Sequence, residues 1–345
     1  MSPISLRPAP RGGDAPRSAE DMLAWLDGPT LLTIAGRDRS RTRGVATLLH
    51  GNEPSGLRAI VEILRSDPAP ATDVVCLVGA VEAARTAPAF THRMLPGRRD
   101  LNRCFRAPYV ETEGEAAREA LRLLRQAGSE ALVDLHNNTG RNPVYGVGTN
   151  LGAACLNLAS LFGERYVWSD LRLGSLIEET ADDFPSVTIE CGRAGDPAAD
   201  AAALAGLRRY LALPALETRI VTAPRMTIFS DPVRVCIRRG LRLAFGTRPV
   251  DDADVTLGDD IDSHNFQPVL PGAPIGWIGR RGIWPLEARG ADGEDVSQDL
   301  FVLRDGRLET RRGVVPIMMT TDPGVAAADC LFYVVQVHEE IGGGS

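Results

Sequence analysis

The sequence predicts an α/β fold: a doubly wound, mostly parallel sheet with helices on both faces, followed by a smaller, mostly β domain. Short apolar runs alternate with helical stretches between about residues 31 and 212, which is the pattern of parallel strands joined by crossing helices. The runs are nearly continuous in Val, Leu and Ile, as in strands buried on both faces. After Pro214 the short runs are separated by Gly, Pro and Asp turns instead.

The elements of the first domain follow from these patterns in chain order. Residues 1–17 are rich in Pro, Arg and Gly, so we expect a flexible N-terminal arm. Ser18 followed by Asp21 resembles a capping box and predicts a short helix that reaches Trp25. The expected strands are Leu31–Ile34, Val45–Leu49, Val74–Val78, Ala131–Leu135 and Val187–Glu190. The expected helices are Gly56–Arg65, Glu113–Gln126, Gly152–Leu161 and Asp200–Leu211.

The second domain is expected to begin near residue 215. Its candidate strands are Arg219–Val221, Val233–Ile237, Leu241–Phe245, Pro274–Ile278, Leu300–Leu303 and Leu331–Val337. The predicted organisation is therefore an arm at 1–17, an α/β domain at 18–214, a β-rich domain at 215–341 and a flexible tail at 342–345. Gly and Ser make up that tail, as in flexible linkers.

Composition excludes several classes of protein. The net charge of −7 argues against a nucleic-acid or anionic-membrane partner. All 38 cationic residues are arginine, so Schiff-base chemistry and a P-loop, which both need lysine, are excluded. The six cysteines are scattered without a Cys-x-x-Cys motif, unlike a disulfide framework or a thiolate metal site. Without a signal-peptide pattern or a run of eighteen apolar residues, we expect a cytoplasmic protein; homo-oligomer formation is left open.

Two of the five histidines lie where a metal ion could be held. His50 ends an apolar run, at the carboxyl end of a strand where ligands bind in open α/β sheets, and Glu53 follows at the start of a helix. His136 ends another run, and Asp134 shares its strand face, as a carboxylate that orients a metal-binding histidine would. Two His and one Glu leave one zinc position open for water, which is typical of catalytic sites. The alternatives are an incidental His50 and a hydrogen-bonded core His136.

Two further stretches carry chemistry. Glu190 lies in an apolar run, and a buried carboxylate is costly unless it is paired or neutralised. A general base that deprotonates water and protonates a leaving amine would explain it, as would a salt bridge to arginine. The run Arg98–Phe105 is rich in arginine and contains Asn102. It could grip a substrate carboxylate, because arginine binds carboxylates through two hydrogen bonds, or it could be solvated surface.

Together these stretches resemble the succinylglutamate desuccinylase and aspartoacylase family, which is related to the zinc carboxypeptidases. The resemblance covers about residues 45 to 340. It rests on the motifs His50-Gly51-Asn52-Glu53, Asp100-Leu101-Asn102-Arg103, Asp134-Leu135-His136-Asn137 and Ile189-Glu190-Cys191-Gly192, with Asn265-Phe266-Gln267-Pro268 in the β domain.

The resemblance implies roles for individual residues. It implies Zn²⁺, one ion per chain, on His50, Glu53 and His136, and it makes Glu190 the general base and acid. It further implies that Asn102 and Arg103 hold a substrate carboxylate, and that an arginine stabilises the oxyanion. The best match for that arginine is Arg93, with Arg98 and Arg99 as alternatives.

The expected function is that of a zinc-dependent amidohydrolase that cleaves a small, carboxylate-bearing N-acyl amino acid to a carboxylate and a free amine. One alternative is a zinc carboxypeptidase acting on small peptides, and another is a non-catalytic binding or regulatory protein on the same fold. Residues 18–214 would then be the catalytic domain.

Two departures from the family pattern bear on the substrate. Thr180, rather than the arginine that binds a second carboxylate, lies about ten residues before Glu190, and Arg172 is a weaker substitute. Met318–Pro323 contains no counterpart of the family's substrate-binding tyrosine. Acidic residues surround Thr180 and should repel a dicarboxylate, so a cationic or neutral distal group fits at least as well. These acidic residues are Glu178, Glu179, Asp182 and Asp183.

Overall fold

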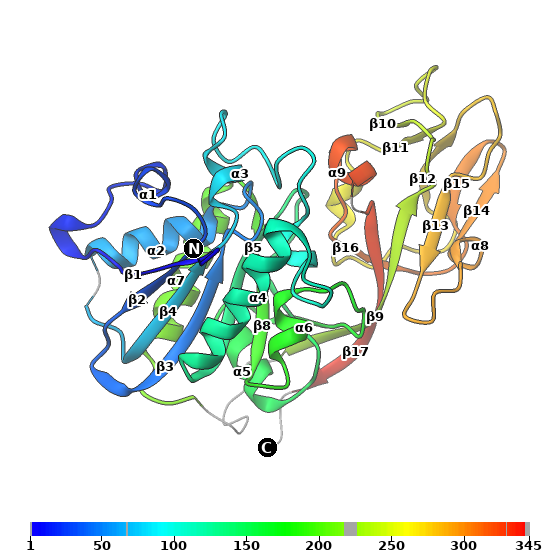
Figure 1. Cartoon of the computed structure of the whole chain (residues 1–345). Helices are drawn as coiled ribbons and strands as arrows, with labels where there is room; N and C mark the ends of the chain where they lie inside the picture. Colours follow the sequence, from blue (N-terminus) through cyan, green and yellow to red (C-terminus); the bar gives the residue numbers. More distant parts are fainter. Residues whose placement is uncertain (1, 67, 217–225, 329, 342–345) are drawn as a thin grey trace.

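A large twisted sheet with helices on both faces forms the body of the molecule (Figure 1). The structure is a computed structural model, and it describes residues 2–66, 68–216, 226–328 and 330–341. Within these residues the sheet has 12 strands in the order β1-β2-β4-β3-β5-β8-β6-β7-β9-β17-β16, with β13 paired to β9. The neighbours β4, β3, β5 and β8 are all parallel, so the predicted α/β fold with a mostly parallel sheet is confirmed.

Each of the five apolar runs expected as strands in the first part of the chain overlaps an observed strand, and three further strands, β1, β6 and β7, were not predicted. The observed bounds are β1 (Ser5–Pro8), β2 (Thr30–Ile34), β3 (Asp38–Thr47), β4 (Thr72–Val78), β5 (Ser129–Asn138), β6 (Tyr145–Gly148), β7 (Arg165–Trp168) and β8 (Ser186–Arg193). The later strands of this sheet are β9 (Met226–Ile237), β13 (Leu286–Arg289), β16 (Val315–Ile317) and β17 (Phe332–Ile341).

Apolar side chains from both sheet faces pack under two sets of helices. On one face lie α1 (Ala19–Trp25), α2 (Ser55–Ser66), α5 (Ala153–Ser160) and α7 (Pro197–Ala212). On the other face lie α4 (Glu111–Gln126) and α6 (Leu176–Thr180). The short α3 (Val81–Arg85) follows β4. The predicted start of α1 is confirmed, because the Ser18 side chain accepts a hydrogen bond from the Asp21 amide.

The N-terminal segment differs from the expected flexible arm. Residues Ser5–Pro8 form β1, which pairs in parallel with β2 at the edge of the sheet. Ile4 is 3% exposed, and Ala15 packs into the core beneath α1. Pro and Arg in this segment suit an edge strand as well as a coil, so composition alone could not separate the two.

The second unit is a five-stranded sheet in the order β10-β11-β12-β15-β14. Its elements are β10 (Leu243–Phe245), β11 (Val255–Leu257), β12 (Pro274–Ile278), β14 (Phe301–Arg304), β15 (Arg307–Thr310), α8 (Ser297–Leu300) and α9 (Pro323–Ala328). The candidate strand at 219–221 and the tail at 342–345 lie outside the described residues. The boundary near residue 214 stays a prediction.

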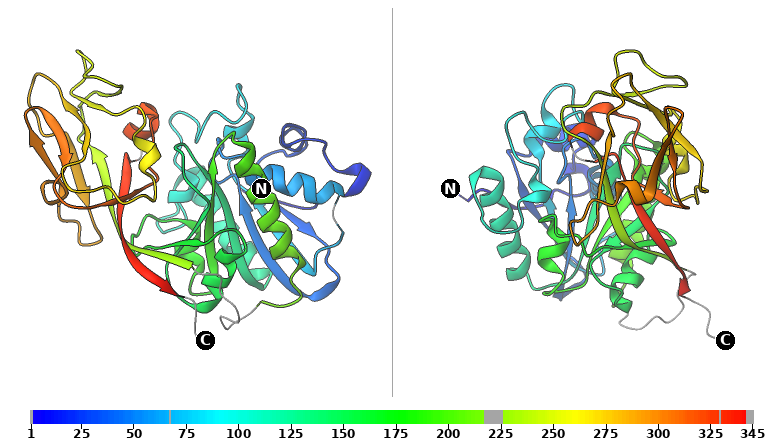
Figure 2. Two further views of the ribbon diagram at one scale, coloured as in Figure 1. Left: turned by 180° about the vertical axis from the view of Figure 1, so that it is seen from behind. Right: turned by 90° about the vertical axis from the view of Figure 1, so that its right-hand side faces the viewer.

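Two long strands join the two units, as both views of Figure 2 show. β9 pairs with β7 at its start and with β13 at its end, and β17 lies beside it along most of its length. The backbone of β9 bends at Asp231, where φ is 50°, and the β17 register shifts between Val334 and Gln336. A bulge of this kind bends strands while most of the ladder persists.

Among the described residues, no helix has the length and apolar character needed to cross a lipid bilayer.

Candidate active site

The candidate metal ligands meet at the carboxyl ends of two neighbouring strands. His50 follows β3, Glu53 precedes α2, and His136 lies near the end of β5, which pairs with β3 in parallel. This is the edge of an open α/β sheet where ligands bind. The chain turns sharply here: Leu48 has a φ of 56°, a strained value for a branched residue. Gly51 has no room for a side chain, since a Cβ would lie 2.6 Å from the Ala84 nitrogen.

The Glu53 carboxylate bridges the two imidazoles. Its Oε1 lies 2.8 Å from His50 Nδ1, and its Oε2 lies 2.7 Å from His136 Nδ1. The ligand atoms of the three side chains all lie within 4.8 Å of one another, and all three side chains are buried. The predicted ligands are therefore brought together as one group that could hold a metal ion.

Each imidazole is held from behind by a second carboxylate. His136 Nε2 lies 2.8 Å from Asp134 Oδ2, and His50 Nε2 lies 3.1 Å from Asp100 Oδ1. A carboxylate in this position accepts a hydrogen bond from Nε2–H and so leaves the Nδ1 lone pair free to face a metal ion. Asp134 was expected in this role. The matching role of Asp100 was missed, because fifty residues separate it from His50.

The charges of this group favour a cation at its centre. Burial alone would lower the pKa of His136, but the carboxylates of Asp134 and Glu53 outweigh it and raise the pKa well above its ordinary value. Burial alone would raise the pKa of Glu53, yet His50 and His136 hold it well below its usual range. An Nδ1 lone pair and a carboxylate oxygen at 2.7 Å need a proton or a cation between them.

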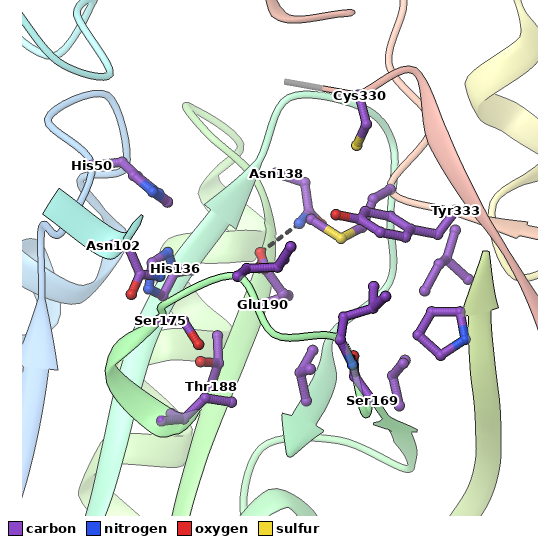
Figure 3. A pocket seen from close by; sticks show the side chains of 18 of the residues that line it. His50, Asn102, His136, Asn138, Ser169, Ser175, Thr188, Glu190, Cys330 and Tyr333 are labelled. Atoms are coloured by element: carbon purple, nitrogen blue, oxygen red, sulfur yellow. Dashed lines mark hydrogen bonds between the residues drawn. The ribbon is translucent and has the colours of Figure 1, made fainter. Parts of the chain in front are cut away.

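Glu190 lies on the next strand, beside His50, Glu53 and His136, which we call the metal group because they could hold a metal ion. It occupies β8, where it is the register partner of His136 on β5. Its Oε2 accepts a hydrogen bond from Nδ2 of the Asn138 side chain, which Figure 3 shows as a dashed line. Burial raises the pKa of Glu190 to about 7, against the lowering effect of His136. A carboxyl group with a pKa near 7 can both take up and return a proton at neutral pH.

The structure separates the three candidate oxyanion arginines. Arg93 lines the cavity that contains the metal group, and Nη2 of its guanidinium donates a 2.8 Å hydrogen bond to Asp100. Its Nη1 lies 3.6 Å from Glu53 Oε1. Arg98 instead pairs with Glu113. Neither Arg98 nor Arg99 lines this cavity.

Asn102 and Arg103 also line the cavity. Asn102 Oδ1 accepts a hydrogen bond from the Leu176 amide at the start of α6, which leaves its Nδ2 as the donor for a ligand. Arg103 Nη1 donates to the Asn102 carbonyl. The short 3₁₀ helix Leu101–Arg103 is capped by Asp100, whose side chain accepts from the Asn102 amide. One carboxylate therefore positions His50, Arg93 and this turn.

No protein-family model matches the chain, and no curated protein does. Solved structures do. The succinylglutamate desuccinylase of Chromobacterium violaceum superposes with a TM-score of 0.57 at 14% identity, over 95% of this chain and 98% of that one. Murine aminoacylase 3 superposes with a TM-score of 0.55 at 19% identity, over 89% of this chain and 100% of that one.

The ectoine utilization protein EutE (DoeB) of Ruegeria pomeroyi is a third such structure, with a TM-score of 0.56 at 18% identity, over 88% of this chain and 87% of that one. The chain has the succinylglutamate desuccinylase/aspartoacylase fold. Because the sequence identities are below 20%, this similarity shows the fold alone. The fold is the one that the four sequence motifs predicted.

Within this desuccinylase/aspartoacylase fold, the structure shows where Thr180, Arg172 and the acidic residues around Thr180 lie relative to the cavity. Thr180 is buried and donates to the Leu176 carbonyl, outside the cavity. Arg172 does not line the cavity either. Of the four acidic neighbours of Thr180, Glu178 is the one that does, and its carboxylate accepts hydrogen bonds from the Leu173 and Gly174 amides.

Two tyrosines in the cavity were missed. Tyr145 of β6 lies beside Glu190, and its hydroxyl is 3.5 Å from Asn138 Nδ2. Tyr333 of β17, a strand of the large sheet, also lines the cavity, and in Figure 3 its hydroxyl points into it. The desuccinylase/aspartoacylase motif pattern places a tyrosine near Met318–Pro323, and Tyr333 lies ten or more residues further along. Its neighbours in sequence, Phe332 and Val334, are typical of a β-strand and give no sign that Tyr333 belongs to a site.

Proposed function

We propose that the chain is a zinc-dependent hydrolase that cleaves the amide bond of a small N-acyl amino acid. The observation that carries the proposal is the buried group of His50, Glu53 and His136 with Glu190 on the adjacent strand. The named activities of the structural neighbours, desuccinylase and aminoacylase, support the same reaction class.

The donor set fits zinc. Two imidazole nitrogens and one carboxylate are the ligands of many catalytic zinc sites, with a further position open. The carboxylates of Glu53, Asp100 and Asp134 give the group an excess of negative charge that a divalent cation offsets. Zinc, when bound, lowers the pKa of a water molecule to about 7 and polarises the amide carbonyl.

The remaining chemistry falls to the side chains around the ion. Glu190 takes a proton from the attacking water and gives it to the amine nitrogen as the C–N bond breaks. The Arg93 guanidinium, held in place by Asp100, stabilises the charge on the carbonyl oxygen. Asn102 and Arg103 bind the substrate carboxylate, and this contact positions the amide bond beside Glu190.

The first test is metal content and turnover, measured on the wild type and on His136→Ala. We expect about one zinc per chain in the wild type and its loss in the variant, together with hydrolysis of N-acetyl or N-succinyl amino acids by the wild type alone. Released amine can be read with an amine-reactive dye, because a lysine-free chain contributes little background.

Two other outcomes would change the proposal. Efficient cleavage of peptides longer than two residues would favour a carboxypeptidase over the hydrolysis of small N-acyl amino acids. A wild type that binds no zinc even after its addition would favour a non-catalytic binding protein.

Asp134→Asn should weaken zinc binding about 10- to 100-fold, because the uncharged amide no longer holds the His136 Nε2 proton as strongly. Competition with a chelator of known zinc affinity measures the change. Asp183→Asn is the control: Asp183 pairs with the exposed Arg125 and does not line the cavity, and its variant should keep the wild-type affinity. Equal affinities in all three proteins would show that Asp134 does not support the metal.

A further inference from the structure

The cavity continues well beyond the metal group and Glu190. We call its far part the distal chamber and define it by one residue from each strand that walls it: Val147 of β6, Val167 of β7, Pro232 of β9, Ile317 of β16 and Tyr333 of β17. Val167 and Ile317 are each 2% exposed and Tyr333 is 6% exposed. These five side chains are apolar except for the Tyr333 hydroxyl, and the hydroxyl-bearing Thr149 and Ser169 also line the cavity.

Sheet order arranges the cavity along one line. His50 and Glu53 follow β3, and His136 belongs to β5. The proposed base belongs to β8 and the distal chamber to β6, β7, β9, β17 and β16, in that order across the sheet. Asn102 lies beside His50 and His136 on the near side, and Tyr333 and Cys330 lie on the far side of Glu190 (Figure 3). The residues proposed to bind the substrate carboxylate, the position of the scissile amide and the distal chamber therefore follow one another across the sheet.

This order assigns each half of the substrate. In an N-acyl amino acid, the carboxylate and the acyl chain lie on opposite sides of the amide carbonyl. With the carboxylate at Asn102 and Arg103 and the carbonyl between the metal group and Glu190, the acyl chain extends past β8 into the distal chamber.

The strands that wall the distal chamber extend further across the sheet than an acetyl group reaches. β9 lies three strand spacings beyond β8, which is roughly 14 Å across the sheet at the usual spacing. An acetyl group ends one carbon beyond the carbonyl carbon, so it would leave most of the apolar wall without contact.

The distal chamber also has no arginine to pair with a second negative charge. Among the described residues that line the cavity, the arginines are Arg93 and Arg103, both on the side of His50 and His136. A succinyl carboxylate in the distal chamber would therefore be buried without a cation, which is unfavourable.

We propose that the preferred substrates carry a neutral, apolar acyl group longer than acetyl, which occupies the distal chamber. The proposal rests on the proposed amide hydrolysis. It makes Val147, Val167 and Ile317 determinants of acyl specificity.

The test is kcat/KM of the zinc-loaded wild type on one series: N-acetyl-, N-butyryl-, N-pentanoyl-, N-hexanoyl- and N-succinyl-alanine, with N-acetylphenylalanine. We expect kcat/KM to rise with each methylene, by up to about fourfold, so that hexanoyl exceeds acetyl by at least about tenfold. N-Succinylalanine should fall at least about tenfold below N-pentanoylalanine, its neutral match in length.

A chamber-filling variant adds an independent readout. Val147→Phe should lower the ratio of hexanoyl to acetyl kcat/KM, because the ring occupies the space of the longer chain. Val250→Phe is the control: Val250 is 42% exposed and lies outside the cavity, so this variant should keep the wild-type ratio.

Four results would overturn the assignment. Preference for N-succinylalanine would mean that the chamber accepts charge. Rates that ignore acyl length but favour N-acetylphenylalanine would place the amino acid side chain in the chamber. Hydrolysis of the acetyl and succinyl substrates with no hexanoyl cleavage would refute the acyl assignment while leaving the proposed hydrolysis intact, whereas a zinc-loaded protein inactive on every substrate would refute both.

Discussion

Glu190→Gln should keep about one zinc per chain and lose turnover by about a hundredfold to ten-thousandfold, the range that general acid–base catalysis contributes. The substitution keeps the shape of the side chain and its neighbour Asn138, but the amide cannot take a proton from water. None of the three metal ligands changes. Metal analysis and kcat on the best N-acyl substrate, measured together, separate the loss of a base from the loss of the ion.

Glu62→Gln is the matched control for this experiment. It makes the same chemical change on the outer side of α2, where the Glu62 side chain is 42% exposed and pairs with Arg65. This variant should retain both zinc and turnover. If Glu190→Gln were as active as Glu62→Gln, Glu190 would not be the base.

Arg43→Ala should lower the free energy of unfolding by about 3–5 kcal/mol, because it empties the space of a large, fully buried side chain and removes the hydrogen bonds that this side chain makes. Arg43 is 0% exposed on β3, in the middle of the sheet. Its Nε donates to Glu130 at 2.8 Å and its Nη1 to the Tyr210 carbonyl at 2.7 Å. The alanine variant leaves Glu130 short of a partner and a void beside the Tyr210 ring. Urea denaturation measures the loss.

Arg41→Ala tests the same carboxylate from the solvent side. Arg41 also pairs with Glu130, but its side chain is 33% exposed, and partly solvated pairs contribute about 1 kcal/mol or less. We therefore expect the two variants to differ by at least about 2 kcal/mol. Equal losses would show that burial of Arg43 adds nothing to the pair.

Much of the metal group could be predicted from sequence because its residues are tied to local patterns. His50 and His136 each end an apolar run, and a parallel sheet brings the ends of neighbouring runs to one edge. Their chemistry and their spacing along the chain are both visible in sequence. The same holds for α1, whose Ser18 cap is a short-range signal.

Other parts of the site depend on contacts between distant segments. Asp100 supports His50 across fifty residues, and Arg93 could be told from Arg98 only by its position in the cavity. β6 has the sequence Tyr145-Gly146-Val147-Gly148, where glycine hides the strand signal, so neither Tyr145 nor Val147 was expected in the site. β1 was missed for a similar reason, since edge strands tolerate Pro and Arg.

The continuity of β9 and β17 bears on how substrate reaches the site. Domain closure usually turns on a few loop residues that absorb the rotation, but here the second unit is attached through ladder hydrogen bonds on both sides of the bend at Asp231. A swing of that unit would have to break paired backbone groups. Ile317 and Tyr333 lie on β16 and β17 of the large sheet, within this paired region, so we expect the cavity wall that they form to stay in place when a ligand binds.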